Sequence, residues 1–165
     1  MAIALARLTP GDWLRLRQVR LAALADAPEA FGSTLARERD LQESDWRARL
    51  EPWHGPKLLA TEDDTIAGMV GSFTDPAHDD VVHLVSMWVA PAYRGSGVAQ
   101  LLLDGFVEDA RDEGRHAVRL TVVETNQPAR RLYRRNGFVE TGETEPYPNR
   151  EGVREIVMVL QLGGR

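Results

Sequence analysis

Cysteine is missing from the 165 residues of the chain. Its absence excludes a disulfide scaffold, a cysteine-based zinc site and a cysteine acyl-enzyme intermediate. Long hydrophobic runs are missing too, because the longest apolar stretches, such as residues 156–160, fall far short of the roughly 20 residues that span a bilayer. The four histidines are scattered and show no metal-binding spacing. We therefore expect no bound metal and no association with a membrane.

Basic residues are fewer than acidic ones, 20 against 25, which gives a net charge of −5. Nucleic-acid binding favours a basic face, so this balance argues against nucleic acid as a partner and is compatible with a cationic substrate. The 43% hydrophobic and 27% charged residues are typical of a folded protein, and the length fits one domain over residues 1–165. The N-terminus does not have the pattern of a signal peptide, so we expect a cytoplasmic protein.

The apolar patterns predict an irregular mixture of strands and helices. Residues 81–89 are almost continuously apolar, as in a central strand that is covered on both faces. In a strictly alternating strand, one face carries the side chains of Val81, His83, Val85, Met87 and Val89. The opposite face carries those of Val82, Leu84, Ser86 and Trp88. Strands are expected at residues 3–8, 81–89, 118–123, 138–141 and 154–162, and a hairpin of two strands within 57–73. Helices are expected at residues 9–26, 43–50, 97–112 and 126–135, and Ser44 is a candidate N-cap of the second helix. This order predicts an α+β, or mixed α/β, fold rather than a doubly wound sheet.

The strongest functional signal is the turn between residues 89 and 99, which joins the best strand to the best helix. Gly95 and Gly97 let the main chain approach an anion closely because they lack Cβ atoms. The first amides of the following helix have no intrahelical partner, and the helix dipole favours negative charge there. With Arg94 adding a charged contact, the segment predicts a pyrophosphate site. The alternative is a plain glycine-containing turn with a solvated arginine.

The familiar nucleotide-binding loops do not match this segment. It has no lysine for a Walker loop and no third glycine for a dinucleotide fingerprint. It resembles instead the Arg/Gln-x-x-Gly-x-Gly/Ala signature of the GCN5-related N-acetyltransferase (GNAT) superfamily, in the form Arg94-Gly95-Ser96-Gly97-Val98-Ala99. A second block resembles the family's Asn-x-x-Ala-x-x-Leu-Tyr-x-x-x-Gly-Phe motif, with Asn126, Ala129, Leu132, Tyr133, Gly137 and Phe138 at the matching positions. The two blocks stand at the family's spacing and cover residues 81–138.

The resemblance implies a central mixed, mostly antiparallel sheet that is splayed between its fourth and fifth strands and flanked by about four helices. It also implies that acetyl-CoA is the co-substrate and that coenzyme A lies in the splayed opening. Main-chain groups of Met87 and Val89 would pair with the pantetheine arm, and an N–H near Val89 would polarise the thioester carbonyl. The amides of residues 94–99 would hold the pyrophosphate, while Asn126 would bond to pantetheine or only cap its helix. The implied cofactor-binding set is Met87, Trp88, Val89, Arg94, Gly95, Ser96, Gly97, Val98, Ala99 and Asn126, although the side chains of Met87 and Trp88 need only pack in the core.

Tyr133 stands where the family commonly places a general acid, which would protonate the departing thiolate. Without the motif, a half-buried structural tyrosine is the alternative. His83 is a candidate base that would deprotonate the amine, or else a structural strand histidine. Glu38 and Glu124 are further candidates, with solvated carboxylates as the simpler interpretation. Since cysteine is absent, direct attack by the amine in a ternary complex is the simplest mechanism.

The acceptor amine is the least determined part, because fold and donor site say little about it. It could be a small amine, an amino acid, an antibiotic or a peptide N-terminus. The expected pocket combines residues 13–50 with the loop at 142–152, which contains Tyr147 and Asn149 and whose acids could attract a cationic amine, namely Glu143, Glu145 and Glu151. A homodimer is compatible with the resemblance. Two alternatives stay open, a catalytically idle acyl-CoA sensor and a transferase that uses a longer acyl-CoA.

Overall fold

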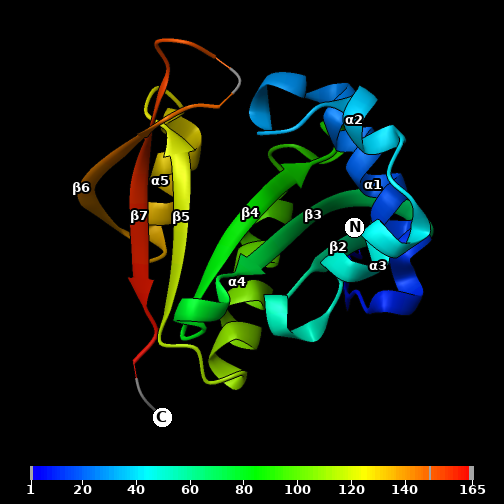
Figure 1. Ribbon diagram of the computed structural model, residues 1–165, viewed down its shortest axis with the longest axis horizontal. Coiled ribbons are helices and arrows are strands. Elements are labelled where there is room, and N and C mark those ends of the chain that lie inside the picture. The colour runs from blue at the N-terminus through cyan, green and yellow to red at the C-terminus, as the bar shows by residue number, and fades with distance from the viewer. Residues whose placement is uncertain (1, 149, 164–165) are drawn as a thin grey trace.

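The computed structural model describes residues 2–148 and 150–163. Within these ranges seven strands form one sheet in the order β1-β2-β3-β4-β5-β7-β6, and five α-helices pack around it (Figure 1). Neighbouring strands are antiparallel except for the parallel pair β4–β5, so the expected mixed, mostly antiparallel sheet is confirmed. The strands are β1 Ala4–Arg7, β2 Leu58–Glu62, β3 Thr65–Thr74, β4 Val81–Val89, β5 Ala117–Val123, β6 Val139–Pro146 and β7 Arg154–Gln161. The helices are α1 Trp13–Asp26, α2 Leu35–Arg39, α3 Glu43–Arg49, α4 Val98–Asp112 and α5 Gln127–Arg135.

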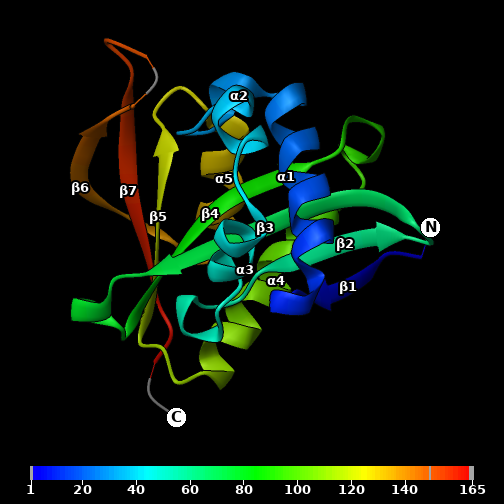
Figure 2. The same cartoon turned by 45° about the vertical axis from the view of Figure 1, so that its right-hand side comes forward.

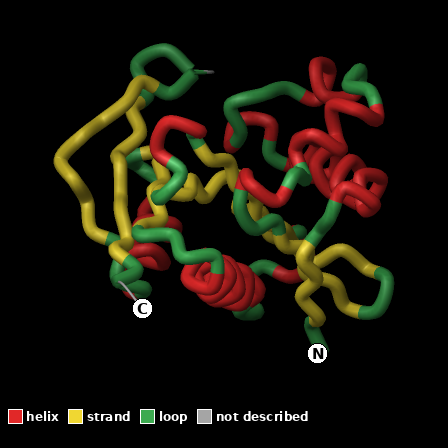
Figure 3. The backbone as a smooth tube through the Cα atoms, turned by 60° about the horizontal axis from the view of Figure 1, so that its bottom comes forward, coloured by secondary structure: helices red, strands yellow, loops and turns green. Residues whose placement is uncertain are grey.

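Helices cover both faces of the sheet, because each contributes an apolar stripe that must be buried. Leu102 and Phe106 of α4 lie in a core on one face. Val19 of α1 and Trp46 of α3 lie in a second core on the other face. Figure 2 shows α1 and α3 in front of the strands, and Figure 3 shows α4 nearly end-on on the opposite side. In the described part of the chain, no helix is both long enough and apolar enough to cross a membrane.

The sheet divides where β4 and β5 separate. Their parallel pairing runs only from Val81 opposite Ala117 to His83 opposite Arg119. Beyond that point β4 stays paired with β3, and β5 stays paired with β7 along its whole length. Figure 1 shows the two strands meeting at the lower end of the sheet and diverging toward the top. The splay expected between the fourth and fifth strands is therefore confirmed.

A β-bulge interrupts β4 just after the strands separate. The register between β3 and β4 shifts between Met69 and Gly71, and Ser86 has a φ of 57° although it is not a glycine. One extra residue reverses the alternation of side chains along a strand. Leu84 consequently faces the core beneath α4, whereas Trp88 faces the core beneath α1. The prediction of two strictly alternating faces along residues 81–89 is therefore wrong after Val85.

Three other local expectations differ from the structure. The short helix α2 was not expected, and it brings the number of α-helices to five, because a helix of this length shows no periodic apolar pattern. Ser44 lies inside α3, whose N-cap is Gln42, and the amide of Gln42 donates to Asp45 Oδ2 at 2.9 Å. The strand β6 continues to Pro146 instead of ending at Thr141, since its outward-facing polar residues hide it from a hydrophobic pattern.

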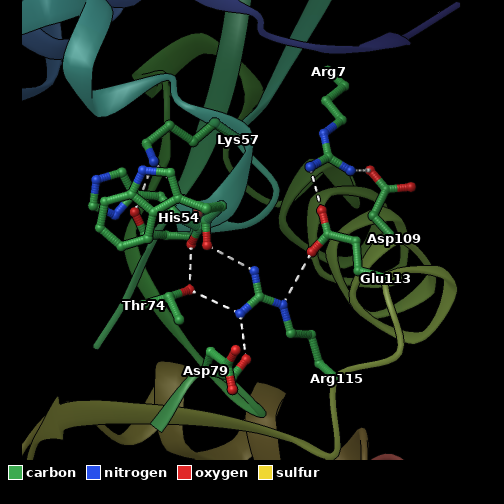
Figure 4. Close-up of polar contacts among 10 residues, drawn as sticks. Arg7, His54, Lys57, Thr74, Asp79, Asp109, Glu113 and Arg115 are labelled. Carbon is green, nitrogen blue, oxygen red and sulfur yellow. Dashed lines mark hydrogen bonds and ion pairs between the residues drawn. The ribbon is translucent and has the colours of Figure 1, made fainter. Parts of the chain in front are cut away.

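Arg115, between α4 and β5, ties together several connections at the paired end of the sheet (Figure 4). Its guanidinium donates to the carbonyl oxygens of Trp53 at 2.9 Å and Asp79 at 2.6 Å, and to Thr74 Oγ1 at 3.1 Å. Its Nε also lies 3.4 Å from the carboxylate of Glu113. These bonds fasten the end of the sheet at which β4 and β5 still pair. The opposite end is left free to open.

Gly68 of β3 is a position where the fold leaves no room for a side chain. A Cβ atom there would lie 2.6 Å from the carbonyl oxygen of Trp88 and 3.1 Å from Leu102 Cδ1. Because the first contact is with main chain, the strands or α4 must move, and we expect Gly68→Ala to lower the free energy of unfolding by about 1–3 kcal/mol. Urea denaturation measures this change. Gly11→Ala is the control, since the nearest atom there is 3.9 Å away, and an equal loss in both variants would contradict the prediction.

Candidate active site

A cleft of about 720 Å³ lies where β4 and β5 diverge. Its walls come from β4, the turn before α4, the first turn of α4, β5 and α5, so the two sequence motifs meet in one place. The expected residues that line it are Met87, Val89, Arg94, Gly95, Gly97, Val98, Ala99, Asn126 and Tyr133. Trp88 does not line it, because the bulge turns that side chain into the core beneath α1. Ser96 does not line it either, and its hydroxyl donates to the carbonyl of Tyr93.

Four main-chain amides at the start of α4 are available to an anion. Gly95 and Gly97 adopt left-handed φ angles of 78° and 89°, which glycine tolerates without strain. In the described ranges, the amides of Gly95, Gly97, Val98 and Ala99 have no main-chain acceptor. The amides of Arg94 and Ser96, which were also expected to bind the pyrophosphate, are used within the turn. Arg94 N donates to Pro91 O at 3.4 Å, and Ser96 N donates to Tyr93 O at 3.3 Å. The free amides and the dipole of α4 together make a site for a phosphate group.

Arg94 is held by protein groups rather than extended into the cleft. Its Nε donates to the carbonyl of Val89 at 3.1 Å, and its guanidinium forms an ion pair with Asp26. Asp26 also accepts a hydrogen bond of 3.0 Å from Trp88 Nε1, and the bonds from Trp88 and Arg94 lower the pKa of its carboxyl. The last residue of α1 thus braces both the turn and the end of β4. The sequence analysis did not identify Asp26 as a site residue. The feature that could have revealed it is an acid at a helix C-terminus, where the helix dipole disfavours negative charge.

Tyr133 and Asn126 both come from α5. Tyr133 is buried in the wall of the cleft, with its ring edge-on to Phe138 at 5.5 Å between centroids. Burial raises the pKa of Tyr133 to about 12, so the phenol stays protonated and remains a proton donor at neutral pH. Asn126 caps α5, because its Oδ1 accepts from Ala129 N at 3.2 Å, and it also lines the cleft. The capping role is therefore present, and the role toward pantetheine stays a prediction.

His83 lies at the paired end of β4, opposite Arg119. Its ring stacks on Phe73 at 4.3 Å between centroids, and it is not among the residues that line the cleft. Burial and the nearby Arg119 lower the pKa of His83, which keeps the imidazole neutral at pH 7. A neutral imidazole is able to accept a proton, but the ring of His83 does not line the cleft between β4 and β5. Its catalytic role stays a prediction.

Glu38 is wholly buried, so the interpretation as a solvated carboxylate is wrong. Arg20 donates to its two oxygens at 2.8 and 2.9 Å, and Arg49 donates to one of them at 2.8 Å. Burial opposes ionisation, but these hydrogen bonds outweigh it and lower the pKa of Glu38 to about 2. A carboxylate this weakly basic does not take a proton from an amine at neutral pH. Arg20 also donates to Ser86 Oγ at 2.6 Å, so the buried acid positions the residue at the bulge.

A second hollow, here called the side hollow, encloses about 310 Å³ on the α1–α3 side of β4. It meets the cleft at Val85 and Ser86, which line both. The acids expected around the acceptor line neither of them, namely Glu143, Glu145 and Glu151. Tyr147, on the same loop, donates instead to the carbonyls of Glu29 and Phe31 and ties the loop to the segment before α2. Asn149 lies outside the described residues.

Glu155 of β7 is a titratable cleft residue that sequence reasoning missed. Burial raises the pKa of its carboxyl, against the effect of a hydrogen bond from Thr121. A carboxylate with a raised pKa in a cleft is a typical candidate for a general base. Glu124, the other acid considered, is exposed at the end of β5 and does not line the cleft. Among the described residues, no group of three or more His, Cys, Asp and Glu side chains is arranged to hold a metal ion.

Comparison with protein families gives one clear match. A model of the acetyltransferase (GNAT) family matches residues 18–138. Mycothiol acetyltransferase from Thermomonospora curvata is 36% identical over 129 residues, which are 76% of this chain and 39% of that protein. The L-amino acid N-acyltransferase MnaT from Escherichia coli is 32% identical over 91 residues, 53% of this chain and 52% of that protein. The chain thus spans about two fifths to one half of the length of these relatives.

Solved structures share the fold over the whole chain. The structure of yncA from Salmonella typhimurium with its cofactor acetyl-CoA superimposes with a TM-score of 0.77, and the match covers 100% of this chain and 96% of that chain. Its sequence identity of 19% restricts this likeness to the fold.

The buried Glu38 gives a stability prediction. We expect Glu38→Gln to lower the free energy of unfolding by about 3–5 kcal/mol at pH 7, because it leaves two arginines without their shared anion. The pKa of about 2 lies below the ordinary 4.5, so the stabilisation is present above pH 4.5 and is lost as pH falls from 4.5 toward 2. Urea denaturation at several pH values should show the two proteins converging in that window. A constant difference down to pH 2 would contradict the assignment.

Proposed function

The chain belongs to the GNAT family of acetyltransferases, and from this premise we propose that it transfers an acetyl group from acetyl-CoA to an amine by direct attack in a ternary complex. One observation carries the proposal: free amides at the head of α4 and the buried phenol of Tyr133 line the same cleft. The first feature suits the diphosphate of coenzyme A, and the second suits its departing thiolate. The relatives' names refer to mycothiol and to L-amino acids and so give different acceptors.

The donor would lie along the edge of β4 that β5 has left unpaired. The amide of Ala90 donates to Ala67 O on β3 at 2.8 Å. Main-chain groups alternate in direction along a strand, so those of Val89 and Met87 point the other way, into the cleft. This supports pairing of the pantetheine arm with these two residues. The carbonyl of Val89 already accepts a hydrogen bond from Arg94. The main-chain N–H of Val89 is therefore the group best suited to bind the thioester oxygen.

The chemistry requires a neutral amine, whereas an alkylamine has a pKa of about 10.4. Glu155 is the cleft residue best suited to take this proton, directly or through water, because its raised pKa makes it more basic than an ordinary carboxylate. The nitrogen then attacks the thioester carbon, and the N–H of Val89 stabilises the oxyanion. When the C–S bond breaks, Tyr133 donates its proton to the thiolate, whose conjugate acid has a pKa of ~8.5 by analogy with cysteine. The attacking nitrogen gives up its second proton as the amide forms, and this proton returns to the phenolate of Tyr133, directly or through water.

Two alternatives remain in competition with this proposal. An acyl-CoA sensor would use the same anion site without the chemistry, and a transferase with a longer acyl-CoA would use the same residues with another donor. A panel of acetyl-, succinyl- and longer thioesters, with thiol release measured for each, separates them. The single domain, the homodimer and the cytoplasmic location stay predictions.

The anion site is tested by binding alone. Gly97→Ala places a Cβ atom on a residue with φ of 89°, so the local main chain must turn and carry its free amides away. We expect calorimetry to show the Kd for coenzyme A rising on the order of tenfold, as for the loss of a hydrogen bond to a charged group. Gly114→Ala is the matched control, because it introduces a similar strain (φ 78°) at the other end of α4. An unchanged Kd for coenzyme A in Gly97→Ala would show that the diphosphate does not bind to this turn.

The phenol is tested by turnover. Tyr133→Phe keeps the ring in its buried contact with Phe138 and removes only the proton donor. We expect kcat to fall by about 10²-fold or more, with little change in the KM for acetyl-CoA. Tyr93→Phe serves as the control, because Tyr93 also lines the cleft but its hydroxyl donates to the carboxylate of Glu62 at 3.1 Å. If wild type and Tyr133→Phe release thiol at the same rate, the tyrosine is structural; if neither does while coenzyme A binds, the sensor is favoured.

A further inference from the structure

The side hollow carries an excess of positive charge. Its lining includes one carboxylate, Glu38, and four cationic side chains, namely Arg20, Arg37, Arg49 and Lys57. Both oxygens of Glu38 are already occupied by Arg20 and Arg49. One carboxylate compensates one positive charge, so the walls remain cationic overall. This is the opposite of the acidic surroundings that the net charge of −5 would suggest.

Lys57 is the cation of the hollow that an anionic ligand would stabilise most. Lys57 is 7% exposed, and among the described residues its Nζ donates to the carbonyl of Ser72 at 2.8 Å and to the Ser72 hydroxyl at 3.4 Å. Figure 4 shows Lys57 beside His54, whose pKa is lowered by burial and by the lysine itself, so that the ring stays neutral. Burial, with Arg49 and Arg7, lowers the pKa of Lys57 to about 8. At neutral pH the chain therefore holds a buried ammonium with no carboxylate partner among the described residues, which is costly unless a ligand supplies one.

The position of the hollow connects this charge to the reaction. It meets the cleft at Val85 and Ser86, where β4 bulges. Apart from its charged residues, the lining of the hollow includes the apolar side chains of Leu16, Met69 and Phe73. A volume of about 310 Å³ suits a small molecule rather than a protein segment. A ligand that fills it would place one end among the cations and the other beside the thioester.

We propose that the acceptor amine also bears a carboxylate, as in a free amino acid with an apolar side chain, and that Lys57, Arg37 and Arg49 bind this carboxylate in the side hollow. The inference rests on the proposed acetyl transfer and adds the substrate class. The amine then points to Val85 and Ser86, and the apolar side chain packs against Met69 and Phe73. These cations are specificity residues, and they take no part in moving protons.

The test compares acceptors that differ only in the carboxylate. Free amino acids with apolar side chains are measured against their amides, at equal concentrations of the neutral amine, by release of free coenzyme A. We expect kcat/KM to be at least about tenfold higher for the acids, because a charge-assisted contact is lost in the amides. Equal values for acids and amides would overturn the substrate class and leave acetyl transfer intact.

Variants assign the effect to the side hollow. Lys57→Met keeps the buried stem and should lower kcat/KM for the acids by a larger factor than kcat/KM for the amides, so that most of the preference for acids is lost. Arg37→Gln should act in the same direction and leave the free energy of unfolding nearly unchanged, because Arg37 is exposed. Arg39→Gln on the same short helix is the control, since Arg39 is exposed and lines neither hollow. A parallel loss for acids and amides in Lys57→Met would contradict the proposal.

Calorimetry separates a failure of this inference from a failure of the proposed function. Apolar amino acids are titrated into the complex with coenzyme A, for the wild type and for Lys57→Met. Binding that Lys57→Met abolishes supports the hollow as a carboxylate site even if no amine is acetylated, in which case the proposed transfer fails alone. Absence of binding, together with absence of any preference in turnover, overturns the inference.

Discussion

The separation of β4 from β5 after His83 is the constraint on which the site depends. A continuous sheet would use the main-chain groups of Val89 to bind a neighbouring strand, and no cleft would exist. The bulge at Ser86 adds to this, because it turns Trp88 toward α1 and leaves Met87 and Val89 on the side of α4. The strained φ of Ser86 is held by Arg20, which the buried Glu38 fixes in turn. Glu38, which is too weakly basic to take a proton, thereby supports the opening in which the proposed proton transfers would occur.

Charge is distributed unevenly around that opening. The head of α4 offers uncharged amides to an anion, while the side hollow offers cationic side chains. Both therefore favour negative groups, although the chain as a whole carries a net charge of −5. Tyr133 and Glu155 line the same cleft as the head of α4, and burial raises the pKa of both. The charge and burial around each group, more than the net charge of the chain, determine which ligand or proton transfer that part of the site favours.

Much of the fold could be predicted from the sequence, because long apolar patterns and paired motifs carry it. The strand at residues 81–89, the helix after Gly97 and the splay all follow from such signals. The bulge could not be predicted, since nothing in the run from Val85 to Trp88 marks an extra residue. Asp26 and Lys57 were not identified as site residues, and the burial of Glu38 was not predicted, for another reason. A single charged residue is taken as solvated until its partners are known, and those partners are distant in sequence. Most of the residues that line the cleft could be predicted because they lie in two contiguous motifs, whereas the side hollow is assembled from residues that are scattered along the sequence.

The meeting of the two hollows at Val85 and Ser86 has a consequence for the order of events. One opens between β4 and β5, and the other opens beneath α1–α3. In the proposed transfer, donor and acceptor would therefore approach from different sides, and either could bind first. The spent carrier would leave without passing the new amide, and a fresh acyl donor would enter while the side hollow is still occupied.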